Sequence, residues 1–265
     1  MFFTTIFPNP GQKLKAPGTS VSVKKYESEK TKERRTIPQK NQGTKAVFFA
    51  VARFLIYGVL VILSTQIIAS DAETDTAIKF SEASKTEWSQ TFYLLSAVAV
   101  LVLVFFLSQG YEAITLLMGG GMLTLMIREQ DYYLDNIYHG AWFPFALAVT
   151  AITLFLVLKR RKQLWENIRE YIKTPSFGIF VIAAMEIFVF SRLFGKKTVW
   201  MDLFDVNQLD IVQRGVKNAA EEGSELFGYT MLFAAMLEFA YYICSKNETT
   251  SGKSNQHDSR IRTQK

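Results

Sequence analysis

The apolar stretch TFYLLSAVAVLVLVFFL, from Thr91 to Leu107, decides the fold class because it contains no charged residue. A helix needs roughly 20 apolar residues to cross a bilayer. Runs of similar character lie at 46–69, 112–127, 141–158, 177–194 and 226–244. The sequence therefore predicts an all-α integral membrane protein, a polytopic bundle of about six transmembrane helices. The runs at 91–107, 112–127 and 177–194 are short, so it stays open whether each crosses completely.

The segments outside these runs are polar. Residues 1–45 contain ten Lys or Arg residues, three Glu residues and four prolines. Such a segment buries too little apolar surface to offset its chain entropy, which predicts a disordered basic tail. Residues 46–245 form the predicted transmembrane domain, and residues 246–265 form a polar C-terminal tail, also expected to be disordered. The basic N-terminal tail suits anionic lipid head groups or a solvated role in orientation, and nucleic acid is not an expected partner.

The basic connection KRRKQLWENIREYIK (159–173) sets the predicted orientation. Basic residues in short connections mark the cytoplasmic side. With six crossings, both tails then also lie in the cytoplasm, and the acidic connection 70–90 lies outside. No cleavable signal peptide is recognisable. We therefore expect a multi-pass protein of the cell inner membrane, whose partners are the lipid bilayer and other membrane proteins.

Charged residues gather in MIREQDYYLDNIYHGAWFP (126–144), between the third and fourth runs. On one helix, Arg128, Asp131, Asp135 and His139 would recur at i, i+3, i+7 and i+11 and share one stripe. Asp135 and His139 are candidate ligands of one divalent metal ion, with Asp131 as a further ligand or an orienting group. The alternative is an interfacial cap, in which tyrosine and tryptophan rings lie at head-group depth beside ordinary ion pairs.

A second acidic cluster precedes the last apolar run. Glu222 and Glu225 are three residues apart and would project from one helix face as metal ligands or a general base. The alternative is a solvated helix entrance, neutralised by Lys217 and Arg214. The predicted topology puts both clusters on the outer face, where a bundle can bring them together with Arg128. One resulting hypothesis is a metal-dependent membrane enzyme acting on a lipid-like substrate.

Glu186, Arg192 and Glu238 are charged residues within the predicted spans, in addition to Arg53 and Glu112 near the starts of two spans. Charges inside a bilayer face a partner or an aqueous cavity. They suit proton or ion relay in a carrier, and they equally suit hydrogen bonds between helices. The triple glycine at 119–121 predicts either very close helix packing or a break in the third run.

The familiar catalytic motifs are absent from the sequence. It contains no HExxH, no GxSxG, no phosphate-binding loop and no dinucleotide fingerprint. With only two histidines, a bis-histidine haem site is not expected. The leading interpretation is an interaction or accessory component of a membrane. The alternatives are the metal-dependent enzyme and a proton- or ion-coupled carrier, so the sequence leaves open whether the chain is an enzyme.

Overall fold

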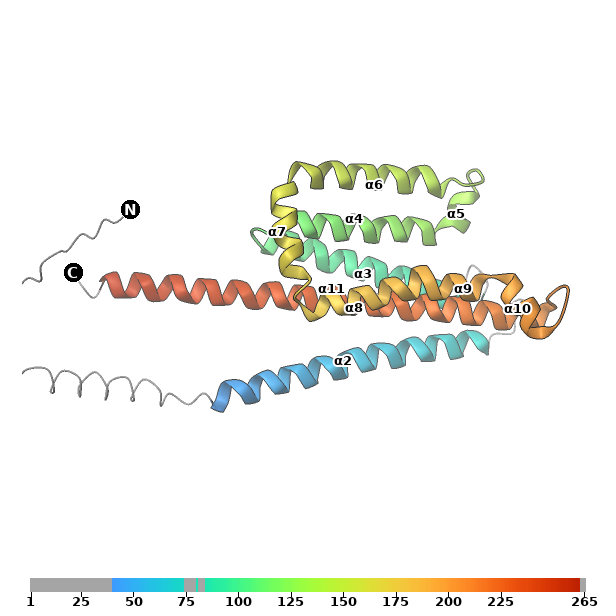
Figure 1. Cartoon of the computed structure of the whole chain (residues 1–265), viewed down its shortest axis with the longest axis horizontal. Coiled ribbons are helices and arrows are strands. Elements are labelled where there is room, and N and C mark those ends of the chain that lie inside the picture. Colours follow the sequence, from blue (N-terminus) through green and yellow to red (C-terminus); the bar gives the residue numbers. More distant parts are fainter. Residues whose placement is uncertain (1–39, 74–79, 81–83, 263–265) are drawn as a thin grey trace, which may run out of the picture. The chain divides into compact units, whose positions relative to one another are not determined.

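The computed structural model describes the backbone of residues 40–73, 80 and 84–262, and the regular structure in this part of the chain is entirely helical (Figure 1). Residues from Phe54 onward form one compact unit, while residues 40–53 are the first part of helix α2. The elements are α2 (Lys40–Ala72), α3 (Lys85–Leu107), α4 (Glu112–Glu129), α5 (Asp131–Asp135), α6 (Trp142–Lys159), α7 (Arg161–Tyr171), α8 (Pro175–Met185), the π-helical turn η1 (Glu186–Phe190), α9 (Ser191–Gly195), α10 (Lys197–Phe204) and α11 (Ile211–Arg262).

Five helical segments in the described part of the chain are long and apolar enough to cross a membrane. They are Val47–Ala72, Lys85–Leu107, Trp142–Lys159, Pro175–Gly195 and Ile211–Lys246. The predicted multi-pass, all-helical class is thus supported by length and composition. Helix α4, which corresponds to the run at 112–127, is not among the five. Its charged ends and central glycines lower its apolar character, although its 18 residues match the length of α6.

Helix α11 is central to the packing of the compact unit. It packs against α3 and α8, while α4 packs between α3 and α6 (Figure 1). The buried core contains side chains of α11 such as Leu226, Met236, Phe239 and Ile243. By contrast, most of α6 is exposed, with Phe155 at 58% and Leu158 at 64% exposure. Apolar side chains on the outside of a bundle are what contact with lipid tails requires.

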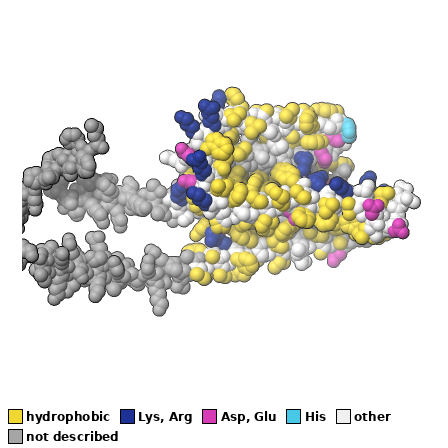
Figure 2. All heavy atoms as spheres, in the orientation of Figure 1, with side chains coloured by type: hydrophobic (Ala, Val, Ile, Leu, Met, Phe, Trp, Pro, Cys, Tyr) yellow, Lys and Arg dark blue, Asp and Glu magenta, His cyan; other side chains and the backbone are white. Residues whose placement is uncertain are grey.

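Helix α4 connects two ends of the compact unit that differ in chemistry. At one end, Tyr111 just before α4 hydrogen-bonds to Glu170 of α7 and receives a hydrogen bond from Lys246 of α11. At the other end, Arg128 donates to Tyr229 of α11. In Figure 2, Lys and Arg side chains gather at the end where α7 lies, with apolar side chains along the flanks. We call these the α7 end and the Arg128 end.

The triple glycine does not break α4, whose backbone is helical throughout 119–121. Gly120 faces α6 so closely that an added Cβ would lie 2.7 Å from the Cβ of Thr153. Nothing lies within 4 Å of an added Cβ at Gly119 or Gly121. A hydrogen bond of 3.1 Å between the hydroxyls of Thr124 and Thr150 joins the same two helices. Close packing is therefore the role of one glycine of the three.

Helices α2 and α11 extend into the segments that the sequence assigns to the tails. Residues 40–45, assigned to a disordered tail, have helical backbone at the start of α2, and the rest of the predicted N-terminal tail lies outside the described residues. The segment 246–265 is also expected to be disordered, yet the backbone of α11 stays helical as far as Arg262. Extending an existing helix costs far less than nucleating a new one, and the apolar part of α11 supplies the nucleus.

Candidate binding site

A polar cavity of about 770 Å³ opens at the Arg128 end, among α3, α4, α9 and α11. We call it the polar chamber. Six acidic and three basic side chains are part of its lining: Glu87, Glu129, Asp131, Glu221, Glu222, Glu225, Arg128, Arg192 and Lys217. Such a density of charge in a cavity is costly unless the groups are paired or a ligand compensates them.

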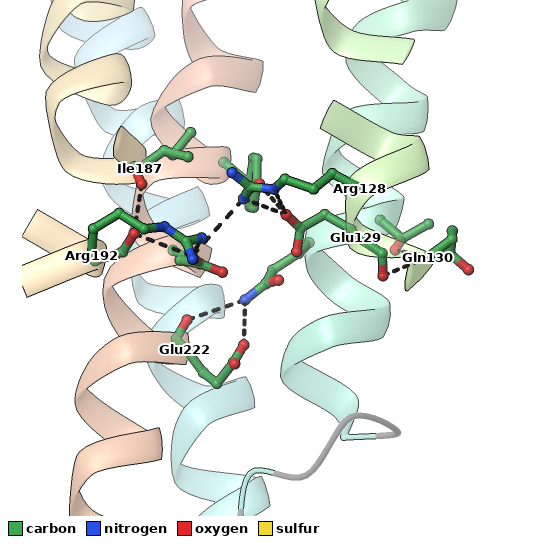
Figure 3. Close-up of polar contacts among 11 residues, drawn as sticks. Arg128, Glu129, Gln130, Ile187, Arg192 and Glu222 are labelled. Carbon is green, nitrogen blue, oxygen red and sulfur yellow. Dashed lines mark hydrogen bonds and ion pairs between the residues drawn. The ribbon is translucent and has the colours of Figure 1, made fainter. Parts of the chain in front are cut away.

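Glu225 is the centre of the charge network in the polar chamber. Its carboxylate accepts hydrogen bonds from the guanidinium of Arg192 and, at 3.1 Å, from the hydroxyl of Ser191. The guanidinium of Arg128 lies 3.9 Å away on the other side. Figure 3 shows the two arginines approaching from opposite helices. The buried carboxylate of Glu225, 5% exposed, thus joins α4, α9 and α11.

A second group of contacts fixes Arg128. Its Nη2 lies 2.6 Å from Glu129 Oε1 and 3.0 Å from the hydroxyl of Tyr229. That hydroxyl in turn donates to Glu129 Oε1 at 2.6 Å. Tyr229 is only 1% exposed, so its hydroxyl needs these partners. The guanidinium is consequently held at the rim of the chamber in a defined position.

Glu222 is bound by an amide rather than by a basic side chain. Gln90 Nε2 donates to the carboxylate of Glu222 at 3.0 Å and to its backbone carbonyl at 3.2 Å (Figure 3). Gln90 is fully buried, and its Oε1 has no hydrogen-bond partner among the described residues. Glu221 instead pairs with Lys217 at 2.5 Å. The carboxylates of α11 are therefore neutralised unequally.

The π-helical turn η1 interrupts the regular geometry of the helix that supplies Arg192. A π-turn adds a residue to one turn and rotates the next part of the helix, and such turns are frequent at functional sites. Here Glu186, the first residue of the turn, accepts a 2.6 Å hydrogen bond from Ser224 of α11. Gly228 lets α11 approach this turn, since an added Cβ would lie 2.5 Å from Ile187 Cγ1. Both contacts tie the turn to α11.

The expected stripe of four residues does not form, because α4 ends at Glu129 and the short α5 ends at Asp135. Gly140 then adopts a φ of 80°, which favours glycine, and its N–H donates to Asp135. His139 Nδ1 lies 3.3 Å from Asp135 Oδ2, with the imidazole fully exposed. Only Arg128 and Asp131 of the stripe line the polar chamber.

The three candidate metal ligands do not converge on one point, although Asp135 and His139 form a pair. In the described part of the chain, no group of three or more His, Cys, Asp or Glu residues is arranged to hold a metal ion. Asp131 Oδ1 accepts a hydrogen bond from the backbone of Tyr132, next to it in the sequence. The metal-site hypothesis thus gains no support from the geometry.

The other candidates are all held by partners. Arg128, Arg192, Glu222 and Glu225 meet around the polar chamber, whereas Glu238 lies further along α11 and accepts a hydrogen bond from Tyr57 of α2. Sequence reasoning did not identify Gln90 or Ser191. The sequence did offer one signal for Gln90, because this polar residue directly precedes the apolar run at 91–107. A polar side chain at that position needs a hydrogen-bond partner within the protein.

An apolar groove of about 610 Å³ adjoins the polar chamber. It lies among α4, α6, α7 and α8, and its lining includes Ile114, Met118, Leu125, Thr153, Leu154, Ile168, Phe177, Phe180 and Phe188. From Ile114 to Arg128 it extends along nearly the whole of α4. Arg128 and Trp142 line both the groove and the polar chamber. The two spaces therefore meet at these side chains.

Comparison with protein-family models, with curated proteins and with solved structures finds no match for this chain. Functional interpretation consequently rests on the geometry of the polar chamber and the apolar groove.

Proposed function

We propose that this chain is a six-span protein of the cell inner membrane that binds a lipid-like molecule with an amine-bearing head group. The head group occupies the polar chamber and the hydrocarbon tail occupies the apolar groove. The observation that carries the proposal is the meeting of the two spaces at Arg128 and Trp142. Binding an amphiphile suits the accessory membrane role expected from the sequence.

Six crossings are supported by the hydrogen bonds at the two ends of α4. The 18 residues of α4 extend for about 27 Å at ~1.5 Å per residue. Its two ends contact two well-separated positions of α11, Lys246 through Tyr111 and Tyr229 through Arg128. Helix α4 therefore runs alongside residues 229–246 of α11 for most of its length, which supports a sixth crossing. The basic connection at the α7 end favours a cytoplasmic location for that end.

The charge of the polar chamber favours an amine over a purely anionic head group. Its acidic side chains outnumber its basic ones by six to three. The basic side chains are already paired, Arg128 with Glu129, Arg192 with Glu225 and Lys217 with Glu221. Glu222 has the amide of Gln90 instead, so an ammonium group would add the missing positive charge.

The apolar groove matches the other half of such a ligand. Most small-molecule sites are largely apolar with a few placed polar groups. Phenylalanine side chains of α8 and the small residues Gly120 and Ala146 form the walls of the groove. Within a bilayer, a lipid tail can enter the groove sideways between helices without crossing water. An amphiphile therefore satisfies the polar chamber and the groove together.

No feature of the described residues specifically favours the enzyme hypothesis or the carrier hypothesis. The enzyme hypothesis requires the metal ligands to converge, and Asp135 and His139 lie apart from the polar chamber lining. The carrier hypothesis relies on Glu186, Glu238 and Arg192. The two carboxylates accept hydrogen bonds from Ser224 and Tyr57, and Arg192 donates to Glu225. Such contacts are also those of ordinary helix–helix hydrogen bonding.

Photo-crosslinking in lipid nanodiscs tests the proposal. The full chain is reconstituted with phosphatidylethanolamine that carries a diazirine in one acyl chain, and the labelled peptides are mapped. We expect labelling concentrated on α4, α6 and α8. Leu154→Trp fills the groove and should reduce that labelling severalfold, whereas Ile152→Trp, about 160° around the same helix from Leu154, should not. Labelling spread evenly over all exposed helices would refute the groove.

The head group is tested with the same probe and three competitors. Unlabelled phosphatidylethanolamine should displace it, whereas phosphatidylglycerol and diacylglycerol should not. Glu222→Gln should weaken the preference for phosphatidylethanolamine, with Glu166→Gln on α7 as the matched control. Equal displacement by all three lipids would retain the groove but reject the amine-binding role of the polar chamber.

A further inference from the structure

The outer face of α7 concentrates basic charge at the end of the bundle opposite the polar chamber. Six basic residues between 159 and 173 are exposed, and they are Lys159, Arg160, Arg161, Lys162, Arg169 and Lys173. The acidic residues of this segment are Glu166 and Glu170, and Glu170 pairs with Lys246. Figure 2 shows dark blue side chains gathered at this end. The segment therefore presents a strongly positive surface.

The exposed apolar residues of α7 lie beside the basic ones. Trp165 is 63% exposed and Ile172 is 49% exposed. At 3.6 residues per turn, Arg161, Trp165, Arg169 and Ile172 share one side of the helix (i, i+4, i+8 and i+11). Tryptophan is enriched at membrane–water interfaces and Lys and Arg are enriched in cytoplasmic connections, so both residue types suit a helix at the cytoplasmic membrane surface.

The inner face of α7 fixes this orientation. Asn167 Nδ2 donates to the carbonyl of Gly110 at 2.8 Å, and the ring of Tyr171 packs edge-on against Phe239 of α11. Figure 1 shows α7 running across α4 and α6 rather than along them. If α4 and α6 cross the bilayer, α7 lies parallel to its surface. The basic side chains then sit at the level of the lipid phosphates.

We propose that the outer face of α7 is a binding surface for the phosphate groups of anionic phospholipids in the cytoplasmic leaflet. Lys162, Arg169 and Lys173 contact the phosphates, and Trp165 with Ile172 inserts at the boundary between head groups and acyl chains. This surface is independent of what fills the polar chamber, although it rests on the six-span arrangement. A basic residue near a charged leaflet strengthens binding by roughly fivefold.

A role limited to orienting the chain makes a different prediction. The positive-inside effect depends on the number of basic residues in a short connection, without a fixed arrangement. A binding surface instead requires basic and aromatic residues on one face of an anchored helix, which α7 provides. The two roles differ in lipid selectivity, because orientation alone gives no preference for anionic lipids in the finished protein.

Native mass spectrometry of the detergent-purified full chain measures this selectivity. We expect phosphatidylglycerol to bind at least tenfold better than phosphatidylcholine. The triple variant Lys162→Gln, Arg169→Gln and Lys173→Gln should reduce the ratio to within twofold of one. The double variant Lys196→Gln and Lys197→Gln, which removes an exposed basic pair near α10, should leave it unchanged. Equal binding of both lipids, or equal loss in both variants, would overturn the proposal.

A measurement on the unaltered protein avoids any effect of the substitutions on folding. Phosphatidylglycerol with a photoactivatable head group, in phosphatidylcholine vesicles, should label residues 159–173 in preference to other segments. Labelling confined to the segments around the polar chamber would overturn the assignment to α7. Because this probe reacts through the head group, its outcome is separate from that of the acyl-chain probe for the apolar groove.

Discussion

Replacing Gly120 with alanine tests whether α4 and α6 pack as closely as the structure shows. The added Cβ would lie 2.7 Å from the Cβ of Thr153, and the hydroxyl and methyl groups of Thr153 would lie closer still. Because the Cβ of Thr153 is itself too near, no rotamer of Thr153 relieves the clash. The backbones must move apart by about 0.7 Å to reach an ordinary contact of 3.4 Å.

The expected cost is the balance of two opposing terms. Overpacking a tight contact costs about 1–3 kcal/mol. The alanine also improves helix propensity, by at most about 1 kcal/mol. Gly120→Ala should therefore lower the free energy of unfolding by about 1–2 kcal/mol. Gly119→Ala is the matched control: nothing lies within 4 Å of its Cβ, so only the gain in propensity remains.

Equilibrium unfolding in mixed micelles, monitored by tryptophan fluorescence, measures these differences. Combining Gly120→Ala with Thr153→Gly removes the Thr153 side chain with which the added Cβ would clash. We therefore expect a favourable coupling of about 1–2 kcal/mol between the two substitutions in a double-mutant cycle. The reasoning is refuted if Gly120→Ala is as stable as Gly119→Ala, or if the two substitutions at the contact are additive.

Three further outcomes are expected from other contacts. Tyr229→Phe removes a buried hydroxyl with two polar partners, so the free energy of unfolding should fall by about 1–3 kcal/mol; an unchanged stability would show that the hydroxyl is not held as described. Gly228→Ala should destabilise the contact with η1 by about 1–3 kcal/mol, with recovery in combination with Ile187→Ala, and additivity would contradict the contact. Hydrogen bonds from Lys246 and Tyr111 lower the pKa of Glu170, so its contribution is present above its unfolded pKa of ~4.3 and is lost as the pH falls through the lower folded value. Since Glu170 is 44% exposed, Glu170→Gln should lower the free energy of unfolding by under about 1 kcal/mol at pH 7, and by less below pH ~4. Denaturation at several pH values measures this difference, and a difference that does not change with pH would contradict the linkage.

The class of the fold was predictable because lipid imposes one dominant rule. A long run without charged residues, such as 91–107, is typical of a helix that spans a membrane. Several other runs in the sequence have the same apolar character. The limits of the helices were less predictable. Helix α3 begins at Lys85, with Ser84 accepting a hydrogen bond from the Glu87 N–H at its start. A capping motif among polar residues lies outside any hydropathy signal.

The candidate site was predictable in its composition but not in its geometry. The sequence placed Arg128 and the glutamates of α11 on one membrane face, and in the structure Arg128 lies 3.9 Å from Glu225. It could not show that Gln90 holds Glu222, because that contact joins residues 132 positions apart. Nor could periodicity reveal where α4 ends. The stripe that included His139 assumed one continuous helix, whereas α4 ends at Glu129 and α5 ends at Asp135, before His139 is reached.

The polar residues of α11 illustrate how structure separates groups that look equivalent in a sequence. Glu225 and Glu238 are each 5% exposed, and both lie on the same helix. Glu225 lines the polar chamber with two guanidinium groups beside it, whereas Glu238 accepts a hydrogen bond from Tyr57 of α2. In an apolar environment, a helix–helix hydrogen bond fixes which faces meet and at what depth. A carboxylate that also borders a cavity can in addition respond to a ligand, and for that reason we assign Glu225 rather than Glu238 to the candidate binding site.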